Sequence, residues 1–560
     1  MSHKIAFVTY ETPFSPCGGI AAVIGRLPRG IQAASALETV VITPYHRRLE
    51  KTAVLKPNHM GEVDVPFYDQ TVRVNIWRHL DGIGWYFLEP EDRRFFNGAR
   101  HPYDVGTTQW NVATDLLRDS LFFGASVARA IQMIDPDATW ILAMQDWEGG
   151  TAALALVGRT GGHKLFLTLH NSYDSGPVTE DNLRMVGIDP TFCPGPPGRR
   201  EATVLERVLP VIQRPVFTVS DQFALDLTQD LFQAEIMAPH LSTMLDPRLC
   251  GVDNGPFVDP VLDTAIVVEA LRGHYGPLKA WKREKKVRAL HALSQLRPSD
   301  DTPVWGDLSR FKEDDAVWFV MAGRDDTRQK GYDVAVLAIT DFLKNGGDAR
   351  FLFFAMPGDE GLAGLSFLKK LADAFPERVL TLPFRWREGF FAVLQGAEYG
   401  IMPSLYEPFG MANEFYFNGT VGIGRATGGI LEQIVPLRAA SSCSRAVQLR
   451  AGAWHSASAA PTGILFREKD GMESAWVDWS GINRAEYDKI GGFPDRLQQR
   501  MNYPLFRAMA EELRFAIDDG VRVYRESPDL YFRMLVDGIT HIQRSFSWDR
   551  AAREYLRNLL

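Results

Sequence analysis

The sequence has few cysteines, no long apolar segment and no excess of positive charge. Its four cysteines, Cys17, Cys193, Cys250 and Cys443, show neither CxxC nor Cys/His spacing, which argues against a zinc site and against a disulfide framework. No apolar run is long enough to cross a bilayer, and a strand pattern begins at Lys4, where a signal peptide would lie. The formal net charge of −8 argues against a general surface for nucleic acid or anionic membranes. We therefore expect a cytoplasmic protein that binds no nucleic acid and does not insert into membranes.

The chain is too long for one hydrophobic core. It has 560 residues, of which 46% are apolar and 23% charged, as is typical of globular proteins. Strand-like runs alternate with helical patterns, which indicates α/β domains. A polar, proline-containing stretch at 298–315 is typical of a linker. The predicted division is a first domain at 1–305, a second domain at 306–540 and a closing helix at 541–560.

Two successive strand–loop–helix units are expected between Tyr399 and Leu431. The pattern predicts a strand at 399–402, a helix at 410–418, a strand at 420–425 and a helix that opens at Thr427-Gly428-Gly429. Glu407 follows the first of these strands. In parallel sheets ligands bind at the carboxyl ends of strands, and a glycine-rich helix start can receive a phosphate through its N–H groups. One carboxylate and one phosphate cradle at the same edge indicate a nucleotide-sugar site.

The first half of the chain offers two further candidate loops. A strand at 4–10 is followed by a loop that contains Gly18 and Gly19, whose N–H groups could face an anion; the alternative is a tight turn without a ligand. Asp146 follows a strand at 139–144. Its carboxylate either binds an acceptor hydroxyl or caps the helix expected from Thr151 onward.

The second half offers two cations and one aromatic residue. Arg324 and Lys330 lie on the loop after a strand at 317–322, where they could neutralise a diphosphate leaving group. The alternative is that they are ordinary exposed loop charges. Trp386 follows a strand at 379–383 and either stacks on a nucleotide base or packs on the surface.

The motif EPFG at Glu407–Gly410, followed by RATGG at Arg425–Gly429, resembles the signature of the glycogen and starch synthases, which are retaining glucosyltransferases of the GT-B fold. Gly18-Gly19-Ile20 and the segment Thr168–Asn171, which contains His170, are similar to further motifs of that family, in the same order. The resemblance implies an α/β fold with two Rossmann-like domains facing a cleft. It also implies a C-terminal helix that crosses back to the first domain.

The resemblance implies glucosyl transfer from a nucleoside diphosphate glucose, UDP-glucose or ADP-glucose, to an α-glucan, with no cofactor and no metal. The implied catalytic residues are Glu407, His170, Arg324 and Lys330. The implied donor-binding residues are Gly18, Gly19, Asn254, Trp386, Glu414, Thr427, Gly428 and Gly429, and the implied acceptor residue is Asp146. Glu414 lies seven residues after Glu407, whereas related glycosyltransferases carry a second Glu eight residues on.

Several positions depart from the pattern of the family. Pro16 stands where bacterial members carry Lys, Ala22 where they carry Asp, and Gln145 and Glu148 replace two His residues. Three segments, 174–214, 261–314 and 436–502, have no clear counterpart, and 436–460 is expected to be a flexible loop. Two alternatives therefore stay open. One is a GT-B glycosyltransferase with another donor or a small-molecule acceptor, and the other is a carbohydrate-binding relative without turnover.

Overall fold

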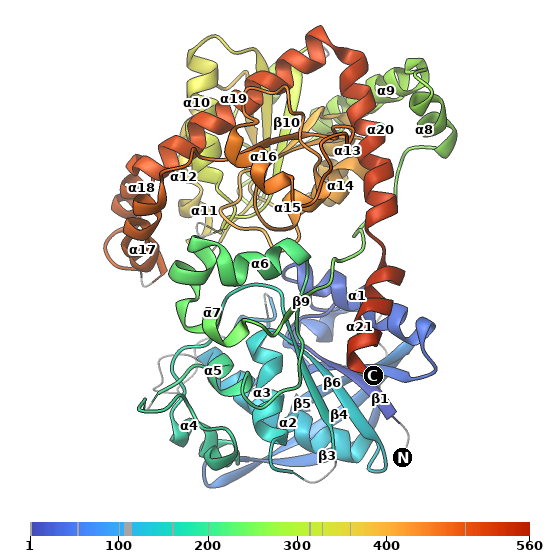
Figure 1. Cartoon of the computed structure of the whole chain (residues 1–560). Helices are drawn as coiled ribbons and strands as arrows, with labels where there is room; N and C mark the ends of the chain where they lie inside the picture. Colours follow the sequence, from blue (N-terminus) through green and yellow to red (C-terminus); the bar gives the residue numbers. More distant parts are fainter. Residues whose placement is uncertain are drawn as a thin grey trace. The chain divides into compact units, whose positions relative to one another are not determined.

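The computed structural model describes residues 3–560 except 53–54, 56, 100, 106–114, 160–161, 200, 313–314, 327–328, 359 and 488. The chain folds into two units, each with its own sheet and core (Figure 1). Unit 1 comprises Met1–Gly255 and Phe546–Leu560, and unit 2 comprises Pro256–Ser545. The division predicted between residues 305 and 306 differs from this one, because the helices after Pro256 pack within unit 2. Among the described residues, no helix combines the length and the apolar character that crossing a bilayer requires.

Unit 1 contains a nine-stranded sheet in the order β3-β4-β5-β2-β1-β6-β7-β8-β9. Its strands are β1 His3–Val8, β2 Glu38–Pro44, β3 Asn58–Phe67, β4 Gln70–Asp81, β5 Ile83–Pro90, β6 Thr139–Gln145, β7 Lys164–Leu169, β8 Val216–Thr218 and β9 Leu249–Gly251. The pairs β3–β4 and β4–β5 are antiparallel and the others are parallel. The central strands β1 and β6 are apolar on both faces, as expected for parallel strands covered by helices. The runs Val72–Leu80 and Trp85–Leu88 in the sequence predict the β4–β5 hairpin, whereas β3 was not predicted.

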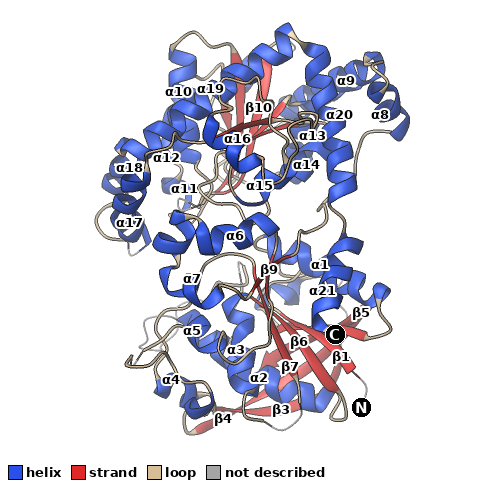
Figure 2. Ribbon diagram, viewed as in Figure 1, coloured by secondary structure: helices blue, strands red, loops and turns tan. Residues whose placement is uncertain are grey.

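The described helices of unit 1 cover this sheet (Figure 2). They are α1 Gly19–Ala34, α2 Asp115–Ile134, α3 Asp146–Leu156, α4 Glu180–Met185, α5 Val204–Val208, α6 Asp221–Gln229, α7 Pro239–Leu245 and α21 Trp548–Leu559, with short turns η1 Arg47–Lys51, η2 Pro190–Phe192 and η3 Phe232–Met237. Helical periodicity in the sequence runs from Asp104 to Ile134. The structure describes this helix from Asp115 onward, and residues 106–114 lie outside the described residues.

The last helix of the chain, α21, is part of unit 1. The sequence predicts Ser547 as its N-cap, and in the structure the Ser547 hydroxyl accepts a hydrogen bond from the Arg550 amide at 3.1 Å. The Tyr555 ring lies against Phe217 of β8 with centroids 4.5 Å apart. On α1, a Cβ added at Gly30 would lie 3.3 Å from Ala552. The helix therefore packs on both α1 and the sheet.

Unit 2 contains a six-stranded, wholly parallel sheet in the order β12-β11-β10-β13-β14-β15. Its strands are β10 Val317–Arg324, β11 Ala349–Met356, β12 Val379–Thr381, β13 Tyr399–Met402, β14 Val421–Arg425 and β15 Ile464–Phe466. Its described helices are α8 Thr264–Leu271, α9 Gly276–Gln295, α10 Tyr332–Lys344, α11 Gly361–Gly364, α12 Ser366–Ala374, α13 Arg387–Gly396, α14 Ala412–Phe417, α15 Gly428–Gln433, α16 Arg445–Ala451, α17 Glu473–Tyr487, α18 Phe493–Asn502, α19 Pro504–Glu526 and α20 Pro528–Ser545, with η4 Leu308–Arg310. The strand order reverses direction next to β10, and such a switch point is where ligands bind in parallel sheets.

Two segments of unit 2 differ from the sequence prediction. The expected flexible loop at 436–460 contains α16, whose Val447 and Ala451 are fully buried. The expected linker at 298–315 runs along β12, because Trp305 and Thr381 exchange backbone hydrogen bonds of 3.0 and 2.9 Å. Both segments therefore belong to the folded body of unit 2.

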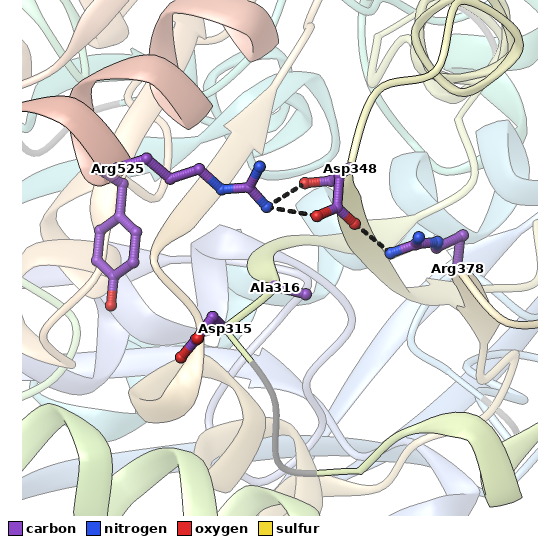
Figure 3. A pocket seen from close by; sticks show the side chains of 6 residues that line it. Asp315, Ala316, Asp348, Arg378 and Arg525 are labelled. Carbon is purple, nitrogen blue, oxygen red and sulfur yellow. Dashed lines mark hydrogen bonds and ion pairs between the residues drawn. The ribbon is translucent and has the colours of Figure 1, made fainter.

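Charged residues tie α19 to the amino ends of two strands, on the sheet edge opposite the carboxyl ends. Arg525 donates to the Asp348 carboxylate at 2.7 Å and to its carbonyl at 3.0 Å, and Arg378 contacts the same carboxylate (Figure 3). Asp315 and Ala316 line the same pocket, whose volume is about 540 Å³. Because its central carboxylate is already paired twice, we interpret this cluster as a structural fastening.

Lys282 of α9 explains why this helix belongs to unit 2. Its side chain is 2% exposed, and its Nζ donates to the carbonyls of Gln395, Ala397 and Gly419. Gln395 and Ala397 lie at the end of α13, and Gly419 follows α14. The last carbonyls of a helix have no partner within the helix, so this side chain supplies the donors that they lack.

We expect Lys282→Met to lower the free energy of unfolding by about 3 kcal/mol, because it leaves buried carbonyls without a donor. The matched control is Lys279→Met, whose ammonium pairs with Asp529 at the surface and contributes about 0–1 kcal/mol. Urea titration of both variants measures the difference. Equal unfolding midpoints for the two variants would contradict the assigned role of Lys282.

Candidate functional site

In unit 2, the loops after β10 and β13 place a cation against a carboxylate. Lys330 Nζ lies 2.7 Å from Glu407 Oε2, and the Ser404 hydroxyl donates to the same oxygen at 3.0 Å. Gln329 Nε2 lies 3.4 Å from the other carboxylate oxygen. The Glu407 side chain is only 8% exposed. The predicted residues Lys330 and Glu407 therefore meet at the carboxyl ends of neighbouring strands.

The backbone fixes the same two loops against each other. The Leu405 amide donates to the Gln329 carbonyl at 2.8 Å. Gly331 has a φ of 68°, and a Cβ there would lie 2.2 Å from the Pro403 carbonyl oxygen. Only glycine fits this left-handed conformation and this close approach without strain. The Lys330–Glu407 pair thus sits on a rigid base.

Glu414 lies near the same ion pair. It is half-buried in the first turn of α14. Burial raises the pKa of Glu414 to about 7, and the positive charge of Lys330 lowers it. The seven-residue spacing from Glu407 therefore brings this second carboxyl into the electrostatic range of Lys330.

Arg324 and Trp386 are more peripheral. The Arg324 side chain, at the end of β10, is half exposed and lies 3.5 Å from Asp326 Oδ2. Trp386 is half-buried, and a Cβ added at Gly389 would lie 2.1 Å from its ring. The ring thus packs on the first turn of α13, in line with the surface-packing interpretation.

The glycines of the second motif make a close backbone contact with Glu407. The Gly429 amide donates to the Glu407 carbonyl at 3.1 Å, and a Cβ at Gly428, whose φ is 46°, would lie 1.8 Å from that oxygen. Thr427 is buried at the N-cap of α15. The Gly429 N–H is thus bonded within the chain, and a phosphate-binding role of Thr427, Gly428 and Gly429 stays a prediction.

A buried ion network supports these loops, and the sequence did not predict it. Arg425 forms an ion pair with Glu468 at 2.5 Å and donates to the Leu405 carbonyl at 2.6 Å. Arg467 donates to the Ala426 carbonyl at 2.5 Å. Burial alone would raise the pKa of Glu468, but the charges of Arg425 and Arg467 hold it well below its usual range. Arg425 was visible in the RATGG motif, whereas nothing in the sequence linked it to Glu468.

In unit 1, Asp146 and His170 lie together at the carboxyl ends of β6 and β7. The Asp146 carboxylate accepts from the His170 amide at 2.6 Å and from Asn171 Nδ2 at 3.1 Å. Burial raises the pKa of Asp146 to about 7 against these bonds, and the charge of Glu11 adds to the shift. Asp146 has a φ of 52° and itself begins α3, so it does not cap a helix from Thr151.

His170 is neutral and has a defined tautomer. Burial lowers the pKa of His170 to about 3. Its Nε2 lies 2.8 Å from Gln145 Oε1, while Gln145 Nε2 donates to the Ala143 carbonyl at 2.8 Å. Because the amide oxygen faces the ring, Nε2 carries the proton and Nδ1 is left as an acceptor.

The glycine loop of unit 1 already holds a carboxylate. Glu11 Oε1 accepts from the amides of Gly18 at 2.6 Å and Ala21 at 3.1 Å, and Tyr103 donates to Oε2 at 3.3 Å. The Gly18 N–H is therefore occupied, whereas Gly19 is exposed with open space around it. The sequence missed Glu11, although its position after the first strand and before the glycines was a usable signal.

Asn254 lies in unit 1, directly before the start of unit 2. Its side chain is buried, and its amide donates to the Val219 carbonyl at 3.3 Å. The sequence predicted Asn254 as a donor-binding residue, and this role stays a prediction.

The sequence matches known glycosyltransferases along its length. A family model described as the starch synthase catalytic domain matches residues 4–239. The glycogen synthase of Pectobacterium carotovorum is 25% identical over 431 residues, which cover 75% of this chain and 82% of that protein. The glycogen synthase of Kosmotoga olearia is 22% identical over 576 residues, which cover 99% of this chain and 97% of that protein. These matches support a glycogen/starch synthase-like glycosyltransferase.

Solved structures confirm the predicted fold of this synthase-like chain. The catalytic domain of starch synthase IV from Arabidopsis thaliana, bound to ADP and acarbose, matches with a TM-score of 0.67 at 16% identity, over 100% of this chain and 99% of that one. A trehalose-phosphate synthase from Burkholderia xenovorans matches with a TM-score of 0.51 at 12% identity, over 100% of both chains. The fold is GT-B.

We expect Glu468→Gln to lower the free energy of unfolding by about 3 kcal/mol at neutral pH, because it leaves buried guanidinium charge uncompensated. The folded-state pKa of Glu468 lies below its ordinary value of 4.5. Its contribution is therefore present above that value and is lost as the pH falls, by about 1.4 kcal/mol per pH unit.

Urea titrations at neutral and acidic pH check this prediction. The gap between wild type and Glu468→Gln should narrow in acid, whereas the exposed control Glu473→Gln should follow the wild type at both pH values. A gap that stays constant down to acidic pH would contradict the assignment.

Proposed function

We propose that the chain transfers glucose from a nucleoside diphosphate glucose to an α-glucan acceptor, with retention at the anomeric carbon. The observation that carries the proposal is the Lys330–Glu407 pair, held at 2.7 Å where the loops after β10 and β13 meet. The glycogen synthase relatives and the ADP-bound starch synthase support a nucleotide donor and a sugar acceptor.

The donor side of the reaction falls to unit 2. Breaking the bond between the anomeric carbon and the diphosphate leaves negative charge on a phosphate oxygen, which fixed cations stabilise. An ammonium has three N–H donors, so Lys330 can keep its contact with Glu407 while it binds a phosphate oxygen. Arg324, half exposed at the end of β10, supplies the second cation. Glu407 orients the transferred sugar, whose transition state is oxocarbenium-like.

The acceptor side falls to unit 1. Asp146 offers a carboxylate that is already held by His170 and Asn171, and it accepts a hydrogen bond from the acceptor hydroxyl. Because His170 is neutral and carries its proton on Nε2, it orients sugar hydroxyls through Nδ1 and does not donate a charged proton. No metal enters this mechanism. A cytoplasmic location and the absence of nucleic-acid partners stay predictions from the sequence.

A second candidate is a glycosyltransferase with another donor or a small-molecule acceptor. It is favoured by the acidic environment of the unit 1 loops, where Glu11 takes the Gly18 N–H and Pro16 supplies no cation. Burial, and then the charge of Asp146, raises the pKa of Glu148 well above its usual value. The site in unit 1 therefore carries Gln145 and the carboxyl group of Glu148 where the family pattern has two histidines.

The test measures release of nucleoside diphosphate from UDP-glucose and ADP-glucose, with and without a maltooligosaccharide. We expect acceptor-dependent release by the wild type. Lys330→Ala and Glu407→Ala should each lower the rate about 10²- to 10³-fold, because they remove fixed groups that act on developing charge. The control Lys369→Ala removes an exposed lysine that pairs with Asp373 and should keep the rate of the wild type.

Other outcomes separate the alternatives. Release that does not depend on glucan would favour the second candidate. Binding of either nucleotide sugar without release, in the wild type, would contradict catalysis and favour a carbohydrate-binding relative.

A further inference from the structure

The segment 471–502 lacks a counterpart in the resemblance, yet it inserts charged side chains into unit 2. Its two helices, α17 and α18, form a hairpin (Figure 1), and Arg496 of α18 contacts Glu360, which directly precedes α11. We refer to Glu473–Asn502 as the α17–α18 hairpin. Its arginines reach the loops that follow β10 and β11, at the sheet edge that carries Lys330.

Arg500 is the main buried cation of the hairpin. It is 1% exposed, and its Nε donates to Asp333 Oδ2 at 2.5 Å. Its Nη1 lies 3.2 Å from Glu486. Asp333 is itself 1% exposed and lies in the first turn of α10, three residues after Lys330. Arg500 of the hairpin therefore binds the first turn of α10, the helix that follows the Lys330 loop.

Arg500 also acts on the other end of the same loop. Burial raises the pKa of Asp325 to about 7, and the charge of Arg500 is the largest influence that lowers it. Asp325 directly follows Arg324, and Asp333 follows Gly331. Each predicted phosphate-binding cation is therefore close in sequence to a carboxyl group on which the charge of Arg500 acts, because Arg324 directly precedes Asp325 and Lys330 lies three residues before Asp333.

A second arginine anchors the hairpin to the neighbouring loop. Arg496 lies 3.1 Å from Glu486 and 2.9 Å from Glu360, which precedes α11. Glu486 is therefore shared by Arg496 and Arg500. The hairpin is therefore attached both to the segment before α11, through Arg496, and to the start of α10, through Arg500.

A buried ion pair is rarely retained for stability alone, since apolar residues often serve equally well. A guanidinium is planar, so it fixes direction as well as charge. We propose that Arg500 is a positioning residue for the donor: through its hydrogen bond to Asp333 it holds the start of α10 so that Lys330, three residues earlier, meets the diphosphate. This inference rests on the proposed function and assigns the α17–α18 hairpin to the same site.

The test separates binding of the donor from general stability. For Arg500→Gln we expect a rise of about tenfold in KM for the nucleoside diphosphate glucose and in Kd for the free nucleoside diphosphate. KM for the maltooligosaccharide should stay unchanged. Arg500→Lys keeps the charge but not the planar group. Its KM for the donor should lie between those of the wild type and Arg500→Gln.

Two further variants complete the design. Arg507→Gln removes an exposed arginine that donates to Asn502 at the end of the same hairpin, and it should match the wild type. The double variant Asp333→Asn/Arg500→Gln removes both buried charges, so it provides a folded protein if the single variant fails to fold. It should show the same loss of donor affinity as Arg500→Gln, because both changes break one link.

The outcomes are distinguishable. If Arg500→Gln or the double variant is folded and binds nucleoside diphosphate like the wild type, the inference is wrong. A lower unfolding midpoint with unchanged KM values for donor and acceptor would likewise assign Arg500 a purely structural role. If the wild type neither binds nucleoside diphosphate nor releases it, the proposed function fails first and the inference with it.

Discussion

The contact between Lys330 and Glu407 is the constraint on which the rest of unit 2 depends. It requires two loops from neighbouring parallel strands to approach within hydrogen-bond distance. The contacts that hold these loops in place keep the two charged groups together. Gly331 lets the first loop touch Pro403, and Gly428 lets α15 start against the Glu407 carbonyl. Arg425 donates a hydrogen bond to the Leu405 carbonyl, two residues before Glu407. A side chain at either glycine would separate the charged groups without touching them.

The buried charges of unit 2 form two layers around this contact. The inner layer, Arg425 with Glu468, fixes backbone carbonyls next to Glu407. The outer layer, Arg500 with Asp333, fixes the far end of the Lys330 loop. Because a buried charge without its partner is costly, each pair resists displacement of the loop that it holds. Rigidity at the site therefore comes from electrostatics as well as from packing.

Much of the fold could be predicted from the sequence, because it rests on local pattern. The strands at 139–145 and 164–169 are short apolar runs between polar turns, and Ser547 is a sequence-local cap. Glu407 and Lys330 could each be predicted to follow the carboxyl end of a strand, because each comes directly after a local strand pattern. The support could not be predicted: Arg500 and Asp333 are 167 residues apart, and no local pattern joins them. The role of Gly429 was also not predictable, since an N–H that faces a phosphate and one that faces a carbonyl need the same residue.

Unit 1 is discontinuous in the sequence, and this has a consequence for its synthesis. Ribosomes release the chain from its N-terminus, so β1 to β9 emerge long before Trp548–Leu559. Until that helix arrives, the surfaces of α1 and β8 that receive Ala552 and Tyr555 have no cover. Unit 2, by contrast, is one continuous segment and can fold as soon as Ser545 has emerged. The domain that is made first is therefore finished last, and a nascent chain stalled within α20 would carry a complete unit 2 and an uncovered apolar surface on unit 1.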